Sequence, residues 1–131
     1  MLQTTESTKD IADLHFEHKL WMNHLKFYKQ EIEIFNHYME ELVQKNANKD
    51  ALQELEHFQN QYILQGEVIE DMLHEIKRYK PFFTSEMNNY ALVTDTEYFD
   101  YHERFKEKME QFIKIYDELK NEFMQFLSRW L

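Results

Sequence analysis

The sequence predicts an all-α protein, an up-down-up bundle of three long helices with an ordered apolar connection between the second and third. Its 131 residues include one glycine, one proline and no cysteine. This composition disfavours turn-rich β folds and excludes a disulfide framework. Large apolar residues also recur at alternating spacings of three and four, the period of helices packed lengthwise. We expect a single domain over residues 1–131, because this length fits one domain.

The first helix is predicted over about residues 8–45. Ten consecutive positions of the repeat carry nine large apolar residues and one histidine. They are Ile11, Leu14, His18, Trp21, Leu25, Tyr28, Ile32, Phe35, Met39 and Leu42. Asparagines at positions 46 and 48 suit a turn, so we expect the helix to end near Lys45.

The second helix is predicted over about residues 50–79. Its core stripe reads Leu52, Leu55, Gln59, Tyr62, Gly66, Ile69, Leu73 and Ile76, beside a second stripe of Phe58, Gln65, Met72 and Tyr79. Glycine within a helix costs about 1 kcal/mol relative to alanine. We interpret Gly66 as close packing against a bulky aromatic of the first helix, with a pocket over Gly66 as the alternative. Pro81 predicts the helix end, because the residue before a proline is driven out of the α region.

Residues 81–95 form the predicted connection, which is long for a compact bundle and rich in apolar residues. We therefore expect it to pack across one end of the bundle. The third helix is predicted over about residues 96–130, and the capping-box sequence TDTE at 94–97 marks its start. Its core stripe again combines nine large apolar residues with one histidine: Tyr98, His102, Phe105, Met109, Phe112, Tyr116, Leu119, Phe123, Phe126 and Trp130.

Charge narrows the range of partners. The chain has 15 lysines and arginines against 25 acidic residues, a net charge of -10. We therefore expect no binding to nucleic acid or to anionic membranes. No apolar run approaches the roughly twenty residues that span a bilayer, and we predict a cytoplasmic protein. The apolar stripes are too wide for one narrow core, which favours a homodimer or another protein as partner.

Histidines and one carboxylate are the candidate metal ligands. In an up-down-up bundle the first and third helices run parallel, so His18 and His102 lie toward the same end. His15 lies one turn from His18. The C-terminal half of the second helix brings Glu70 and His74 toward that end. Such a set suits zinc, iron or manganese, and without cysteine any metal must be held by imidazole and carboxylate alone.

The alternative interpretation of the two core histidines is structural. A buried histidine can form a hydrogen bond, here to Glu70, Tyr98 or Tyr79, and so fix the helix register. We favour this interpretation. A ferritin-like di-iron centre needs two Glu-x-x-His motifs, whereas the chain has one, from Glu54 to His57, near the opposite end from His18.

Two short strings resemble segments of a group of small bacterial hypothetical helical proteins. They are HFEHKLW at residues 15–21 and EHFQNQ at residues 56–61. The resemblance covers the first and second helices and implies a shared helical fold. No established activity comes with it.

No serine has an arranged base, so we name no catalytic residue. The sequence predicts a non-enzymatic bundle, without a cofactor, that acts through protein–protein contacts. A metal-binding bundle with a histidine and carboxylate site at one end is the alternative.

Overall fold

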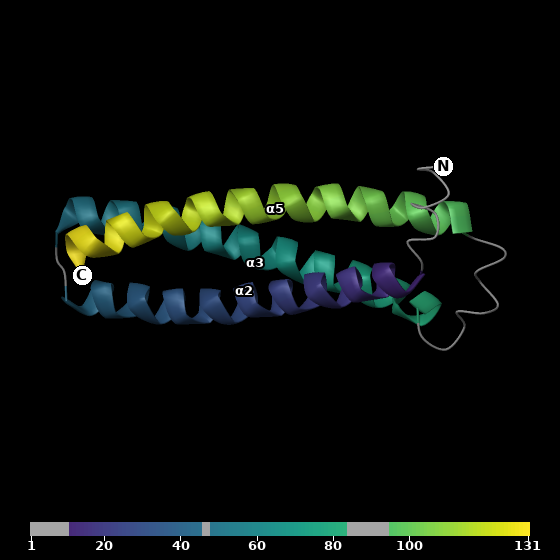
Figure 1. Ribbon diagram of the computed structural model, residues 1–131. Coiled ribbons are helices and arrows are strands. Elements are labelled where there is room, and N and C mark those ends of the chain that lie inside the picture. Colours follow the sequence, from purple (N-terminus) through teal and green to yellow (C-terminus); the bar gives the residue numbers. More distant parts are fainter. Residues whose placement is uncertain (1–10, 46–47, 84–94) are drawn as a thin grey trace.

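The computed structural model consists of three long helices lying side by side (Figure 1). Helix α2 spans Ile11–Lys45, α3 spans Lys49–Phe83 and α5 spans Asp95–Trp130. The structure describes residues 11–45, 48–83 and 95–131. Helices α2 and α5 run in the same direction and α3 runs in the opposite one. The predicted up-down-up bundle is therefore confirmed.

The turn from α2 to α3 lies at the same end of the bundle as the C-terminus (Figure 1). At this turn the Asn48 side-chain oxygen accepts hydrogen bonds from the backbone N–H groups of Asp50, at 2.8 Å, and Ala51, at 3.2 Å. Asn48 is thus the N-cap of α3, because it satisfies two amides that have no partner within the helix. The helix begins at Lys49, one residue earlier than predicted.

Pro81 does not end α3, which continues to Phe83. A proline has no N–H to donate to the carbonyl four residues earlier, so it removes one hydrogen bond from the last turn. The helical backbone nevertheless persists past it, and the predicted end near residue 79 is wrong. Of the predicted connection over 81–95, residues 84–94 lie outside the described part of the chain, as does the start of the predicted first helix at residues 8–10.

The core stripes predicted for α2 and α5 are confirmed. The predicted core residues of α2 are buried from Leu14 to Leu42 and those of α5 from His102 to Phe126, while Trp130 is half-buried. Both core histidines are buried, at 4% exposure for His18 and 1% for His102. The three-and-four spacing therefore identified the inward faces of both helices.

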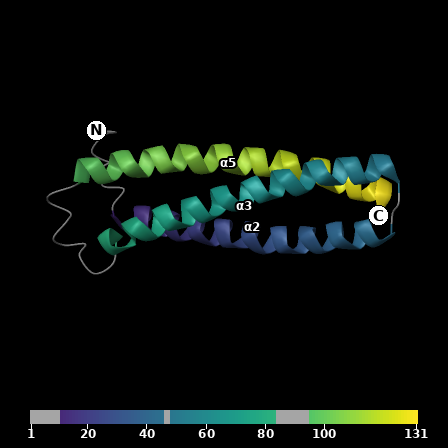
Figure 2. The same cartoon turned by 180° about the vertical axis from the view of Figure 1, so that it is seen from behind.

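Aromatic rings fill the space between α5 and the other two helices. Trp21 of α2 lies 5.2 Å from Phe105, and Phe58 of α3 lies 5.3 Å from Phe123, between ring centroids. Helices α2 and α3 approach each other more closely, because fewer rings separate them and the distance between helix axes follows side-chain size. Figure 2 shows α3 running obliquely across the pair formed by α2 and α5.

Helix α3 buries residues of both predicted stripes, and its buried Ala51 belongs to neither. Its buried residues are Ala51, Leu55, Phe58, Tyr62, Ile69, Met72, Leu73 and Ile76. Phe58 faces the core and Gln59 is exposed, since burying a phenylalanine removes far more apolar area from water. The predicted close packing at Gly66 is also wrong, because a Cβ atom there would meet nothing within 4 Å.

Within the part of the chain that the structure describes, no helix has both the length and the apolar character needed to cross a bilayer.

Candidate functional site

Two carboxylates of α2 reach α5 at equivalent places along the bundle. Glu17 and Glu31 are fourteen residues apart on α2, and their partners His102 and Tyr116 are fourteen residues apart on α5. Both contacts join residues separated by 85 positions. Because α2 and α5 are parallel, one helix register produces both contacts.

We call the first contact and its neighbours His15, His18 and Trp21 the histidine level. We call the second contact and its neighbours Tyr28 and Lys120 the tyrosine level.

At the histidine level, a carboxylate oxygen of Glu17 lies 2.7 Å from Nε2 of His102. A carboxylate can only accept, so Nε2 carries the proton and donates it. The His102 side chain is 2% exposed and that of Glu17 is 34% exposed. The imidazole lies 4.6 Å from the Trp21 ring. The pair is therefore sheltered on its His102 side and open to water on its Glu17 side.

His18 lies next to this pair and is held uncharged. Burial, together with neighbouring His102 and His15, lowers the pKa of His18 to about 4. All three causes act against the imidazolium form, because low polarity and nearby positive charge both disfavour it. The structure thus brings together His15, His18 and His102, three of the five residues predicted as metal ligands, in the N-terminal part of α2 and α5.

Glu70 and His74 lie away from those three histidines. Glu70 forms an ion pair with Lys29 at 2.6 Å, and the hydrogen bond and charge of Lys29 lower the pKa of Glu70 below its usual value. His18 is eleven residues before Lys29 on α2, which corresponds to about 16 Å of helix. The antiparallel α3 has therefore not yet reached the level of His18 at Glu70, and His74 is exposed.

His74 contributes to a shallow groove between α3 and α5 with a volume of about 500 Å³. The groove is lined by Asp71, His74, Glu75, Arg78, Tyr101 and Arg104. Glu75 is already paired with Lys108 at 2.9 Å. Since acidic and basic groups alternate around it, the groove offers no surface of one sign to a charged ligand.

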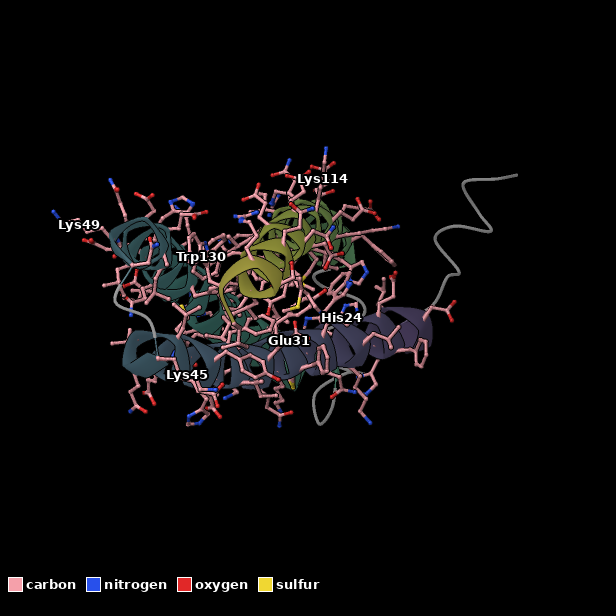
Figure 3. The ribbon with its side chains drawn as sticks, turned by 90° about the vertical axis from the view of Figure 1, so that its left-hand side faces the viewer. His24, Glu31, Lys45, Lys49, Lys114 and Trp130 are labelled. Atoms are coloured by element: carbon pink, nitrogen blue, oxygen red, sulfur yellow. The ribbon has the colours of Figure 1, made fainter. Side chains whose placement is uncertain are left out.

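At the tyrosine level, Glu31 accepts two hydrogen bonds from α5. The Tyr116 hydroxyl donates to one carboxylate oxygen at 2.9 Å and the Lys120 ammonium donates to the other at 2.8 Å. Figure 3 shows Glu31 on the side of α2 that faces α5. The Tyr28 ring lies 4.1 Å from that of Tyr116. Burial and the bond to Glu31 raise the pKa of Tyr116, so its hydroxyl stays protonated and remains a donor.

These contacts supply hydrogen bonding and fix the register of the helices. Among residues 11–45, 48–83 and 95–131, no three histidine, aspartate or glutamate side chains form a group that could hold a metal ion. Glu54, from the Glu-x-x-His motif, accepts hydrogen bonds from Arg129 and from the Trp130 indole. The Ser128 hydroxyl donates to a backbone carbonyl. Metal binding by the five predicted residues stays a prediction.

Glu17 and Glu31 were not predicted as partners of α5. The sequence does contain one signal for these contacts. Glu17 and Glu31 are fourteen residues apart, as are His102 and Tyr116. The predicted hydrogen bond of a core histidine is present, but its acceptor is Glu17 and not Glu70. The side chains of Tyr79 and Tyr98, the other predicted partners, lie outside the described part of the chain.

Comparison with known proteins finds no matching family model, curated protein or solved structure. The chain is therefore classed by its fold, a three-helix bundle whose first and last helices are joined at two polar levels.

Proposed function

We propose that this protein acts through contacts with other protein molecules, made by the outer face of α2, and that it has no enzymatic role. We propose the cytoplasm as its compartment. One observation supports the contact surface: large apolar side chains on α2 are exposed to water. They are Phe16 at 62%, Leu20 at 49%, Phe27 at 53%, Ile34 at 51% and Tyr38 at 39%. We call these five residues the α2 stripe.

The members of the α2 stripe lie in line along the helix. At 3.6 residues per turn its five members fall within an arc of about 40°, and between positions 16 and 38 no other residue falls inside that arc. The stripe is about 33 Å long, at 1.5 Å per residue. Single exposed apolar residues are ordinary, whereas five large ones aligned on one side of a helix favour an interaction site.

The other helices lack such an arrangement within the described residues. The exposed Ile63, Leu64 and Val68 of α3 spread over an arc of about 140°. On α5 the exposed Ile115 and Met124 lie on opposite sides of the helix, since nine residues correspond to about 180°. The outer face of α2 is therefore the best-supported contact surface.

Photo-crosslinking tests this function directly. A photoreactive phenylalanine analogue replaces Phe27 in cells that produce the protein, with the same replacement at Ile63 as the matched control, since Ile63 is also an exposed apolar residue. We expect an adduct of one discrete mass from position 27 and much less from position 63. Equal yields at both positions, or no adduct at either Phe27 or Leu20, would overturn the proposal.

Metal binding is the competing function, and one observation favours it. The low pKa of His18 keeps this imidazole in the neutral form that binds zinc, iron or manganese. Elemental analysis of the purified protein and of a His18→Leu variant tests it. A metal bound at one equivalent in the original chain and lost in the variant would establish this function in place of the first.

A further inference from the structure

The α2 stripe is symmetric about Phe27. Leu20 and Ile34 lie seven residues to either side of it, and Phe16 and Tyr38 lie eleven residues to either side. A helix that packs antiparallel across α2, centred on position 27, therefore meets the same order of large apolar residues from either end. This is the pattern that a two-fold symmetric interface requires, since the same patch must serve on both partners.

We propose that the occupant of the α2 stripe is a second copy of this chain, with its own α2 packed antiparallel about a two-fold axis at Phe27. This inference rests on the proposed function and names its partner. In this arrangement Phe27 meets its own copy, Leu20 meets the partner's Ile34, and Phe16 meets the partner's Tyr38. Every member of the stripe is thereby covered by another large apolar side chain.

Charges beside the stripe favour the antiparallel direction over the parallel one. Lys19, Lys26, Glu33 and Glu40 are exposed and recur every seven residues along one side of α2. The lysines precede Phe27 and the glutamates follow it. A parallel partner would set like charges beside like charges. An antiparallel partner sets Lys19 within two positions of the level of the partner's Glu33, and this pairing occurs twice.

Lys26 lies beside the two-fold axis, so the nearest like charge on the second copy is that copy's own Lys26. This single repulsion is opposed by the two Lys19–Glu33 pairings. On the other side of the stripe, Glu17 and Glu31 are engaged with His102 and Lys120 of α5. The Lys120 ammonium partly neutralises the Glu31 carboxylate within the chain, which lowers the repulsion that two acidic chains would otherwise meet at this surface.

Site-specific crosslinking tests the direction of packing, and the chain is suited to it because it contains no cysteine. Leu20→Cys and Ile34→Cys variants are treated with a short bis-maleimide, each alone and as an equal mixture. We expect covalent dimer from the mixture and little from either variant alone, because the antiparallel arrangement separates two copies of residue 20 by about 21 Å along the helix. Phe27→Cys, at the axis, crosslinks alone.

Two results would overturn the inference. Dimer formed by Leu20→Cys alone would mean parallel packing, and absence of dimer from both the mixture and Phe27→Cys would mean that no second copy covers the stripe. If position 27 is photo-crosslinked to a different protein while the cysteine variants stay monomeric, the second copy is wrong and the proposed function stands. If neither the photo-crosslinking nor the cysteine crosslinking gives an adduct, both the second copy and the proposed function are wrong.

A charge swap tests the flanking contacts without touching the stripe. Lys19→Glu places a glutamate near the partner's Glu33, and we expect the dimer dissociation constant to rise about tenfold, because two pairings become repulsive. Adding Glu33→Lys restores opposite charges and should return the constant close to its original value. An unchanged constant in the single variant, or no recovery in the double variant, would contradict the antiparallel register. Circular dichroism of both variants checks that the fold is retained.

Discussion

The histidine level and the tyrosine level share one geometry and differ in chemistry. At each, a glutamate of α2 accepts a hydrogen bond from an α5 group 85 positions later in the chain. Glu31 is 12% exposed and is held by both a tyrosine hydroxyl and Lys120, whereas Glu17 is 34% exposed and is held by His102. The Tyr116 hydroxyl keeps its proton throughout the neutral range, because burial and the bond to Glu31 raise its pKa. The histidine level contains imidazoles, the side chains that change charge between pH 5 and 8.

The relative register of α2 and α5 is therefore fixed by two different kinds of contact. The tyrosine level holds α2 and α5 in register at any physiological pH. The histidine level adds His18, whose protonation opposes folding because burial lowers its pKa to about 4. Acid should therefore weaken the histidine level before the tyrosine level.

The largest expected effect is the response of the histidine level to pH. The pKa of His18 is about 4 in the folded chain against 6.5 as its ordinary value. Between these values the unfolded chain binds a proton that the folded chain does not, so stability falls as pH decreases. We expect His18 to remove about 3 kcal/mol of stability between pH 7 and pH 4.

Chemical denaturation at a series of pH values measures this loss. The His18→Leu variant should lose less stability than the original chain over the same range, by about that amount. Tyr116→Phe, at the other level, should keep the full pH dependence. Parallel pH profiles for the original chain and His18→Leu would show that His18 carries no such penalty.

Removing each carboxylate compares the two levels at constant pH. Glu31→Ala loses two hydrogen bonds and leaves the buried Tyr116 hydroxyl without its carboxylate, which should cost about 2 kcal/mol. Glu17→Ala loses one bond from a more exposed carboxylate and should cost about 1 kcal/mol. Denaturant unfolding at pH 7 gives both free energies. A larger loss for Glu17→Ala would reverse our ranking of the two levels.

Two buried tyrosines should respond with opposite signs when the hydroxyl is removed. The Tyr116 hydroxyl donates to Glu31, so Tyr116→Phe should lower the free energy of unfolding by about 1 kcal/mol. The Tyr62 hydroxyl is buried and has no hydrogen-bond partner among the described residues, so Tyr62→Phe should raise it by about 1 kcal/mol. If both substitutions change the free energy of unfolding in the same direction, the hydrogen bond to Glu31 does not distinguish the two hydroxyls.

The fold was predictable where the apolar pattern is regular. On α2 and α5 a single stripe of large residues fixes which face is buried, so the predicted cores are correct. On α3 both predicted stripes contribute to the buried face, and Gln59 and Gly66 interrupt the first of them. Phe58 of the second stripe is buried while Gln59 is exposed, because burying Phe58 removes far more apolar area from water. Pro81 shows similarly that a local preference did not set the end of this helix.

The candidate site was predictable only in part. Burial of His18 and His102 follows from their positions in the stripes. Their partners depend on the relative register of separate helices, which no pattern within one helix specifies. His102 therefore pairs with Glu17 of the neighbouring parallel helix, while Glu70, on the antiparallel helix, pairs with Lys29 at a different level.

Sedimentation equilibrium tests most directly the central claim, that the outer face of α2 is a contact surface between copies of this chain. We predict a mass of about twice 16.4 kDa for the original chain and for the Ile63→Glu control, and the mass of a single chain for Phe27→Glu. A single-chain mass for the original protein at the highest concentration reached, or a Phe27→Glu variant that remains as dimeric as the original, would contradict the account.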